Sequence, residues 1–432
     1  MKLSRNKIFI SLFAAAICLS SNEMAGLVLW LSFALIFFSN RLRMSTFQHL
    51  GVFPYFLLLI VCTFSTMALS PFSFDLYFVM RDVFYFLSPI IMLLIGFYVG
   101  RSTSSLNETL WALVVTLSLL SIYIYKDAII SGAILSLSIS TRYTFALDSS
   151  LVTLSLIIMI AAWRNDIQIG PPRTRNSLAV MALFFVIVSL SRINIAVVAL
   201  TFLIVIFQAR WIRYSATFSV LALIILPIAI SGTELGSGNL VSSSSFLEKL
   251  ASSLREVAVQ DQIDFSGINL NWRGYEAFLG YEKVRTNGLS SVFAGLGFGS
   301  FVEGPFQDKL NFIPIFHNGY LTIYFKGGVI GLMLFFYFLK EQATPQIKIR
   351  KDTISETDRK HVMFLDTLAA LIVLSIALRT ASTHGIILPK VPLEILLLGM
   401  VHGARYRLAA QTQDVILARL PIADRRWPKK MV

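Results

Sequence analysis

The sequence predicts an all-α protein that crosses a membrane many times. Of its 432 residues, 56% are hydrophobic and only 14% are charged, whereas soluble domains carry about a quarter charged residues. The mean hydropathy is +0.72, and the apolar residues gather in runs near the roughly 20 residues that a bilayer requires. These observations indicate a polytopic integral membrane protein.

The net charge of +13 does not indicate a nucleic-acid partner. The basic residues form short clusters between apolar runs, a pattern typical of membrane topology rather than of one binding face. Cys18 and Cys62 both fall inside apolar runs. We therefore interpret them as small core residues and expect neither a disulfide nor a metal site.

The apolar runs define the spans in order. Residues 7–21 are interpreted as a retained first span rather than a signal peptide, because a second apolar run follows almost at once. The single spans are predicted at 7–21, 24–39, 52–69, 82–100, 109–126, 145–163, 213–231, 318–339, 361–379 and 386–404.

Residues 177–208 form an apolar run of unusual length. As one helix they would be about 48 Å long, too long for one hydrocarbon core and short for two spans. A single span would put the basic clusters at 164–175 and 210–213 on opposite sides, against the positive-inside bias. Two short spans folded back at 189–192 put both clusters inside. The prediction is then about twelve spans, with both termini cytoplasmic.

This hairpin places Ser189, Ser191 and Arg192 below the outer surface of the bilayer, because each arm is short. A charge at that depth is expected to face water or a partner inside the bundle. The alternative is that Arg192 reaches the outer headgroups and anchors lipid phosphate.

The chain divides around one long outer loop. The predicted parts are an N-terminal bundle at 1–231, the loop at 232–316, C-terminal spans at 317–404 and a basic cytoplasmic tail at 405–432. Within the loop, the apolar spacing predicts an amphipathic helix over 246–260 and a second helical stretch over 269–284. The glycines at 295, 297 and 299 predict tight turns or close backbone approach rather than a dinucleotide-binding loop.

Span parity places several cations on the outer face, and a phosphate-bearing substrate is the ligand that they fit. They are Arg142, Arg192, Arg273, Arg285, His317, Arg379 and His384. Asn318 is a good helix N-cap, and His317 before it is either functional or a passive interface residue. For Arg142, Arg379 and His384, a role as headgroup anchors is an equal alternative.

Four short motifs follow one another in a fixed order. They are "SLSR" at 189–192, "WRGYEAF" at 272–278, "GLGFGSF" at 295–301 and "HNGYL" at 317–321. In this order across a many-span chain, they resemble the bacterial O-antigen ligase and polymerase superfamily, mainly over residues 177–340. The resemblance implies a GT-C-like membrane glycosyltransferase of the inner membrane that needs no metal ion or other cofactor. Such enzymes take an oligosaccharide from undecaprenyl pyrophosphate at the periplasmic face and pass it to a hydroxyl acceptor.

Carried over to this chain, the resemblance implies that Arg192 and Arg273 bind the pyrophosphate and that His317 accepts the proton of the acceptor hydroxyl. A second set is expected to contact substrate. Its members are Asn318, Glu276, Arg285, Arg142, Arg379, His384, Trp272 and Tyr275. Glu276 orients Arg273, binds sugar or forms a structural pair, and the aromatic residues stack on sugar or cover the mouth of the bundle.

The resemblance implies an O-antigen or exopolysaccharide polymerase that joins repeat units held on undecaprenyl pyrophosphate. The alternative within the family is a ligase that delivers the glycan to lipid A-core. A transporter of lipid-linked sugars is less expected, because no repeated half with matched Gly/Pro interruptions is visible. The expected partners are the lipid-linked donor, the glycan acceptor and membrane lipids, and the resemblance leaves room for a protein that controls chain length.

Overall fold

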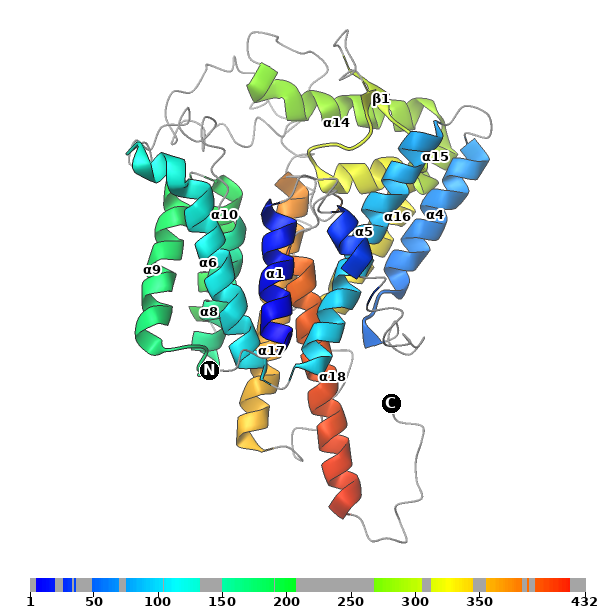
Figure 1. The fold of residues 1–432 in the computed structure, drawn as a ribbon. Helices are drawn as coiled ribbons and strands as arrows, with labels where there is room; N and C mark the ends of the chain where they lie inside the picture. The colour runs from blue at the N-terminus through cyan, green and yellow to red at the C-terminus, as the bar shows by residue number, and fades with distance from the viewer. Residues whose placement is uncertain are drawn as a thin grey trace.

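The computed structural model of the chain is almost entirely helical (Figure 1). It describes residues 5–19, 26–32, 35, 49–69, 75–103, 105–132, 150–189, 191–206, 268–304, 312–344, 355–382, 387 and 393–419; the side chains of Arg192 and Trp272 lie outside this description. Within these ranges, four helices are long and apolar enough to cross a membrane, and shorter apolar helices accompany them. The chain therefore has the architecture expected of a polytopic membrane protein.

The helices follow the apolar runs. The first half contains α1 (Arg5–Leu19), α4 (Phe53–Leu69), α5 (Leu76–Ser102), α6 (Leu106–Ile130), α8 (Ser150–Arg164), α9 (Pro172–Val188) and α10 (Arg192–Ile206). The second half contains α14 (Ile268–Thr286), α15 (Leu289–Ala294), α16 (Gly319–Ala343), α17 (Glu356–Ser382) and α18 (Leu393–Arg419). A short antiparallel pair, β1 (Val302–Glu303) with β2 (Phe312–Ile313), departs from the all-α expectation.

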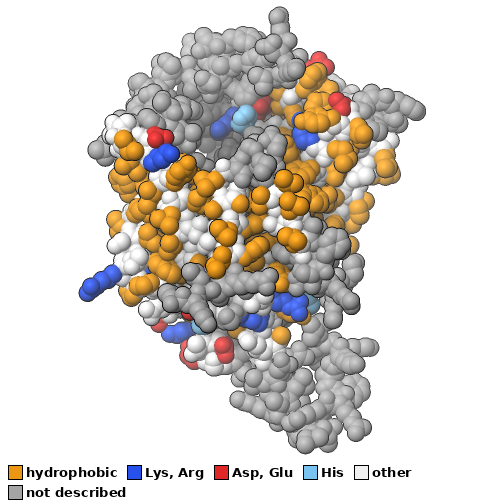
Figure 2. Space-filling model, viewed as in Figure 1, with side chains coloured by type: hydrophobic (Ala, Val, Ile, Leu, Met, Phe, Trp, Pro, Cys, Tyr) orange, Lys and Arg blue, Asp and Glu red, His pale blue; other side chains and the backbone are white. Residues whose placement is uncertain are grey.

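One end of the bundle is covered by α14. This helix contacts α15, α16 and β1, and it lies across the top of the view in Figure 1, whereas α18 extends to the bottom. We call this the α14 end. Figure 2 shows a band of hydrophobic side chains around the middle of the molecule, with most charged side chains above and below it. That distribution is the one a bilayer-spanning bundle requires.

The predicted break at 189–192 is confirmed. The helix breaks between Val188 and Arg192, and α9 and α10 both pack against α8. The hydroxyl of Ser189 donates to the carbonyl of Val186 at 2.8 Å and accepts from the backbone N–H of Ser191 at 3.3 Å. These bonds satisfy backbone groups at the break, which explains why serines stand there.

The contact between α5 and α18 is the most extensive one between described elements, and it depends on glycine. Gly96 and Gly100 of α5 face Gly399 and Gly403 of α18, each pair at a spacing of four residues. A β-carbon on any of the four would collide with backbone atoms of the opposite helix. Small residues at this spacing let the two helix backbones approach closely. Inside a membrane, lipid tails are as apolar as the helices, so this close packing is what drives helices to associate.

A kink in α16 meets the glycine-rich loop. Gly328 has a φ of 64° inside α16, and glycines 295, 297 and 299 have φ values of 74°, 79° and 82°. These positive angles confirm the predicted tight turns and are favourable for glycine alone. The backbone N–H of Gly297 donates to the carbonyl of Lys326 at 3.0 Å, so the loop supplies a hydrogen bond where the kink disrupts the helical pattern.

Some predicted boundaries differ from the structure. The helix predicted at 82–100 begins at Leu76, and α18 continues to Arg419, so the first part of the predicted tail at 405–432 is helical. That part is rich in Ala, Leu, Arg and Gln, which favour a helix, whereas a span is recognised by apolarity alone. The predicted span 213–231 and the predicted amphipathic helix 246–260 lie outside the described residues.

Candidate active site

A buried carboxylate holds a histidine at the α14 end. The Nδ1 atom of His317 lies 2.9 Å from Oε2 and 3.0 Å from Oε1 of Glu276, and the backbone N–H of His317 donates to Oε2 at 3.1 Å. The Glu276 side chain is 4% exposed, whereas that of His317 is 44% exposed. Glu276 therefore fixes the imidazole from the protein side while part of the ring remains accessible.

This contact determines which ring nitrogen can accept a proton. A carboxylate accepts hydrogen bonds, so in the neutral ring the Nδ1 atom facing Glu276 carries the proton. Nε2 is then the basic atom. A carboxylate that orients a histidine in this way is the arrangement found behind general bases. The sequence alone assigns Glu276 to Arg273, to sugar or to a structural pair, and its pairing with His317 is not visible there.

The residues next to His317 are also held in place. The side chain of Asn318 accepts from the backbone N–H of Leu321 at 3.2 Å, so the predicted N-cap of α16 is confirmed. The hydroxyl of Thr322 accepts from the backbone N–H of Phe316 at 3.0 Å. The backbone on both sides of the histidine is therefore fixed by side chains of the first helical turn. A contact of Asn318 with substrate remains a prediction.

Arg273 lies on the same helix as Glu276. The helical stretch predicted at 269–284 is confirmed by α14, and Arg273 stands on it three residues before Glu276. Residues three apart are neighbours on a helix surface, so Arg273 lies one turn from the carboxylate that holds His317. Arg273 is exposed and Tyr275 is half-buried.

Two hydrogen bonds bring the start of α10 to the same end. Asn194, two residues after Arg192, accepts from Nη2 of Arg379 at 2.6 Å. Near the same end of α17, the carbonyl of Ala377 accepts from the hydroxyl of Tyr320, in the first turn of α16, at 3.0 Å. The starts of α10 and α16 therefore lie near one another at the α14 end. The backbone of Arg192 belongs to this end, as its predicted side requires.

Arg379 and Arg285 have partners of their own. Arg379 also lies 3.0 Å from Glu394, so it joins α10, α17 and α18. Arg285 is exposed and pairs with Glu282 at 3.1 Å. It stands about 18 Å along α14 from Arg273, so these two arginines do not share one phosphate-sized site. Direct contacts of Arg379 or Arg285 with substrate remain predictions.

Other predicted residues cannot be placed. Arg142 and His384 lie outside the described residues, as do the side chains of Arg192 and Trp272. Their predicted roles therefore remain predictions.

A fully buried ion pair lies beneath the glycine-rich loop. The ammonium of Lys326 is 2.6 Å from Oδ2 of Asp82, and neither side chain is exposed. The same Oδ2 accepts from the backbone N–H of Gly299 at 2.8 Å, and Lys326 donates to the carbonyl of Ser300. The sequence signal for this pair is a charge inside each of two apolar runs, because such charges require partners. Neither residue is among those predicted for the site.

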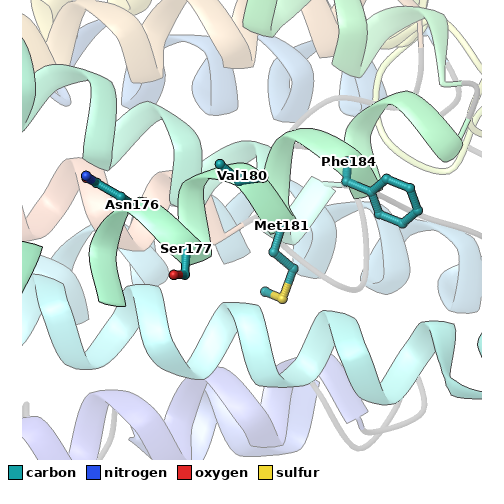
Figure 3. Close-up of a pocket in the computed structure, with 5 residues that line it drawn as sticks. All are labelled: Asn176, Ser177, Val180, Met181 and Phe184. Carbon is teal, nitrogen blue, oxygen red and sulfur yellow. The ribbon is translucent and has the colours of Figure 1, made fainter. Parts of the chain in front are cut away.

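Figure 2 shows a histidine beside a basic and an acidic side chain near the upper rim, above the hydrophobic band. An open hollow of about 600 Å³ lies elsewhere, along α9, where Asn176, Ser177, Val180, Met181 and Phe184 line it (Figure 3). It contains none of the predicted site residues. In the part of the chain that the structure describes, no group of three or more His, Cys, Asp or Glu side chains is arranged to hold a metal ion.

The chain matches no protein-family model, and a search of curated proteins finds no significant relative.

Proposed function

We propose that this protein is a membrane glycosyltransferase that polymerises oligosaccharide repeat units carried on undecaprenyl pyrophosphate. The observation that carries the proposal is the Glu276–His317 pair, a carboxylate-oriented histidine that remains 44% exposed at the α14 end. Arg273 lies one turn away on α14, and the backbone of Arg192 lies at the same end of the bundle. The resemblance of the four motifs to O-antigen polymerases and ligases supports the same assignment.

In the proposed reaction, a hydroxyl of the acceptor sugar attacks the anomeric carbon of the donor. A new glycosidic C–O bond forms as the bond between that carbon and the phosphate oxygen breaks. The electron pair of the broken bond leaves with the lipid diphosphate, and the hydroxyl proton passes to Nε2 of His317. Arg273 and Arg192 stabilise the negative charge that develops on the diphosphate.

Two effects supply the acceleration. A general base contributes typically about 10²–10⁴ in rate, and one electrostatic donor contributes about 10²–10³. Two arginines act on the diphosphate, so together they are expected to matter at least as much as the histidine. Glu276 keeps His317 in the productive tautomer and does not itself exchange a proton.

Charge distribution supports a periplasmic position for the α14 end. Lys360, near the start of α17, pairs with Asp166 in the loop between α8 and α9 at 2.9 Å. This contact places the basic residues at 164–175 at the opposite end of α17 from Arg379. By the positive-inside bias, that end is cytoplasmic. The proposal includes about twelve spans, a GT-C-like bundle, cytoplasmic termini and a location in the bacterial inner membrane.

A reconstitution experiment tests the reaction class. Purified protein in liposomes is given a lipid-linked repeat unit, and the glycan length is read by gel or mass spectrometry. Longer glycans on the lipid support the proposal. Unchanged glycan length, with the lipid moved to the other leaflet, would indicate a transporter instead.

A deletion experiment separates polymerase from ligase. Cells that lack a polymerase are expected to show lipopolysaccharide capped with a single repeat unit. Polymer that remains attached to the undecaprenyl carrier would instead indicate that the lost enzyme is a ligase.

A further inference from the structure

Two further cations lie at the α14 end, on either side of a group of aromatic rings. The guanidinium carbon of Arg81 is 4.7 Å from the ring centre of Phe78, and Nζ of Lys283 is 5.2 Å from that of Phe301. The two rings are 5.4 Å apart, and Phe312 packs against Phe301 at 4.8 Å. Residues from α5, α14, the glycine-rich loop and β2 therefore build one surface.

Arg81 brings a positive charge that its neighbours do not neutralise. Its Nη2 lies 3.3 Å from Asp82, but that carboxylate already pairs with Lys326 at 2.6 Å. The three side chains together therefore carry one net positive charge. The Arg81 side chain is only 17% exposed, and its buried Nε atom has no hydrogen-bond partner among the described residues. Buried polar groups are normally hydrogen-bonded, so this atom favours a ligand that can accept.

The ammonium of Lys283 can donate further hydrogen bonds. Its ammonium donates to the carbonyl of Phe301 at 2.7 Å, which uses one of three N–H groups. Burial lowers the pKa of Lys283, and Glu303 opposes this effect without cancelling it. Burial disfavours the charged form of the Lys283 ammonium, and a bound anion would favour that form again.

The surface beside these cations is apolar. Leu76, Tyr77 and Met80 on the first turns of α5 are each exposed. Two cations next to an exposed apolar surface form a recognition pattern for a lipid with a phosphate-bearing head. Tyrosines and cations at such a boundary also suit phospholipid headgroups, so the experiment must separate the two sources.

The position of Lys283 on α14 relates this surface to the proposed active site. Lys283 follows Glu276 by seven residues on α14, so it lies about 10.5 Å further along the axis on nearly the same face. One helix therefore presents both the carboxylate behind the proposed base and a cation of the second surface. The surface at Lys283 is therefore separate from the site at Glu276 and His317.

We propose that Arg81 and Lys283 bind the phosphate of a second lipid-borne substrate, whose hydrocarbon chain lies on the exposed face of α5. This inference rests on the proposed function, which needs an acceptor as well as a donor. Donor phosphate is assigned to Arg273 and Arg192, and acceptor phosphate to Arg81 and Lys283.

The test counts lipids bound to the purified full-length protein by native mass spectrometry, with geranylgeranyl diphosphate as the probe. Wild-type protein is expected to bind two equivalents. Arg81→Gln with Lys283→Gln is expected to bind one, because affinity at that surface falls about tenfold or more without the charged donors. Arg359→Gln, an exposed arginine that pairs with Glu356 at the other end of the bundle, is the control and is expected to keep two.

Three outcomes would overturn the inference. They are a single equivalent in wild-type protein, two equivalents in the double variant, and equal displacement of the second equivalent by phosphatidylglycerol. If the double variant loses thermal stability, Lys283→Gln alone replaces it and is expected to bind one equivalent. Failure of the proposed function itself is distinguishable, because then Arg273→Gln would not remove either equivalent.

Discussion

The ammonium of Lys326 lies 2.6 Å from the carboxylate of Asp82, at a position where neither side chain is exposed. The pair joins α5 to α16, and both partners also bond the loop between α15 and β1. It therefore fastens the kinked helix that begins beside His317 to the rest of the bundle. A buried charge pair is costly to form, but losing one partner is costlier, because the other charge is left alone.

Asp82→Asn is expected to destabilise the protein by about 3–5 kcal/mol, because it leaves the buried ammonium of Lys326 without its carboxylate. Lys326→Met is expected to cost less, because Arg81 lies 3.3 Å from Asp82 and still compensates its charge. The double variant is expected to lose less than Asp82→Asn alone. Chemical unfolding in detergent, followed by circular dichroism, measures the difference. Additive losses in the double variant would show that the two charges do not interact.

Glu276→Gln is expected to lower kcat within the range of about 10²–10⁴ that a general base supplies, because an amide can favour the wrong tautomer of His317. The apparent KM for the lipid-linked substrate should change little. Combined with His317→Ala, the substitution should have no further effect. A double variant much slower than His317→Ala would assign Glu276 a role of its own. Glu282→Gln, on the exposed side of the same helix, is the control.

Gly403→Leu is expected to separate α5 from α18, because even a β-carbon there collides with the backbone of Phe97 and Arg101. The expected result is a loss of folded protein, measured as the monodisperse fraction after extraction in detergent. Leu119→Val, at an exposed apolar position of α6, should leave that fraction unchanged. Normal extraction of Gly403→Leu would contradict the close approach of the two helices.

Arg379→Gln and Arg285→Gln should differ in stability. Arg379 joins three helices through Asn194 and Glu394, whereas Arg285 forms an exposed pair with Glu282. Exposed pairs contribute about 0–1 kcal/mol, so Arg285→Gln should unfold almost like wild type and Arg379→Gln at lower denaturant. Equal unfolding midpoints for the two variants would contradict a stabilising role for the contacts of Arg379 with Asn194 and Glu394.

Local features of the fold could be predicted from the sequence. Apolar runs locate helices because a bilayer demands length and apolarity from a single segment. The break at 189–192 followed from charge on either side of an over-long run, and the N-cap at Asn318 from its side chain. The tight turns at glycines 295, 297 and 299 could likewise be predicted, because they depend only on local backbone geometry. The continuation of α18 beyond 404 was missed, because a helix need not stop where the apolar run does.

Pairings between distant residues could not be predicted. Glu276 and His317 are separated by 41 residues, and Asp82 and Lys326 by 244. Which carboxylate meets which cation depends on how helices pack, and no local pattern records that choice. A charge inside an apolar run, such as Lys326, requires a partner, but the run does not tell which residue that partner is. The partners of Arg379 could not be predicted for the same reason, because they come from two other helices.

The most direct test of the proposed mechanism is the initial rate of glycan extension by purified protein supplied with a lipid-linked repeat unit. Wild-type protein is compared with His317→Ala, Arg273→Ala, Arg192→Ala and the control Arg359→Ala, all at equal folded concentration; Arg359 forms an exposed pair with Glu356 at the other end of the bundle. The expected result is a loss of at least about a hundredfold for the first three and a near-normal rate for the control. Near-normal extension by any two of the first three would contradict the proposal that these residues form one active site.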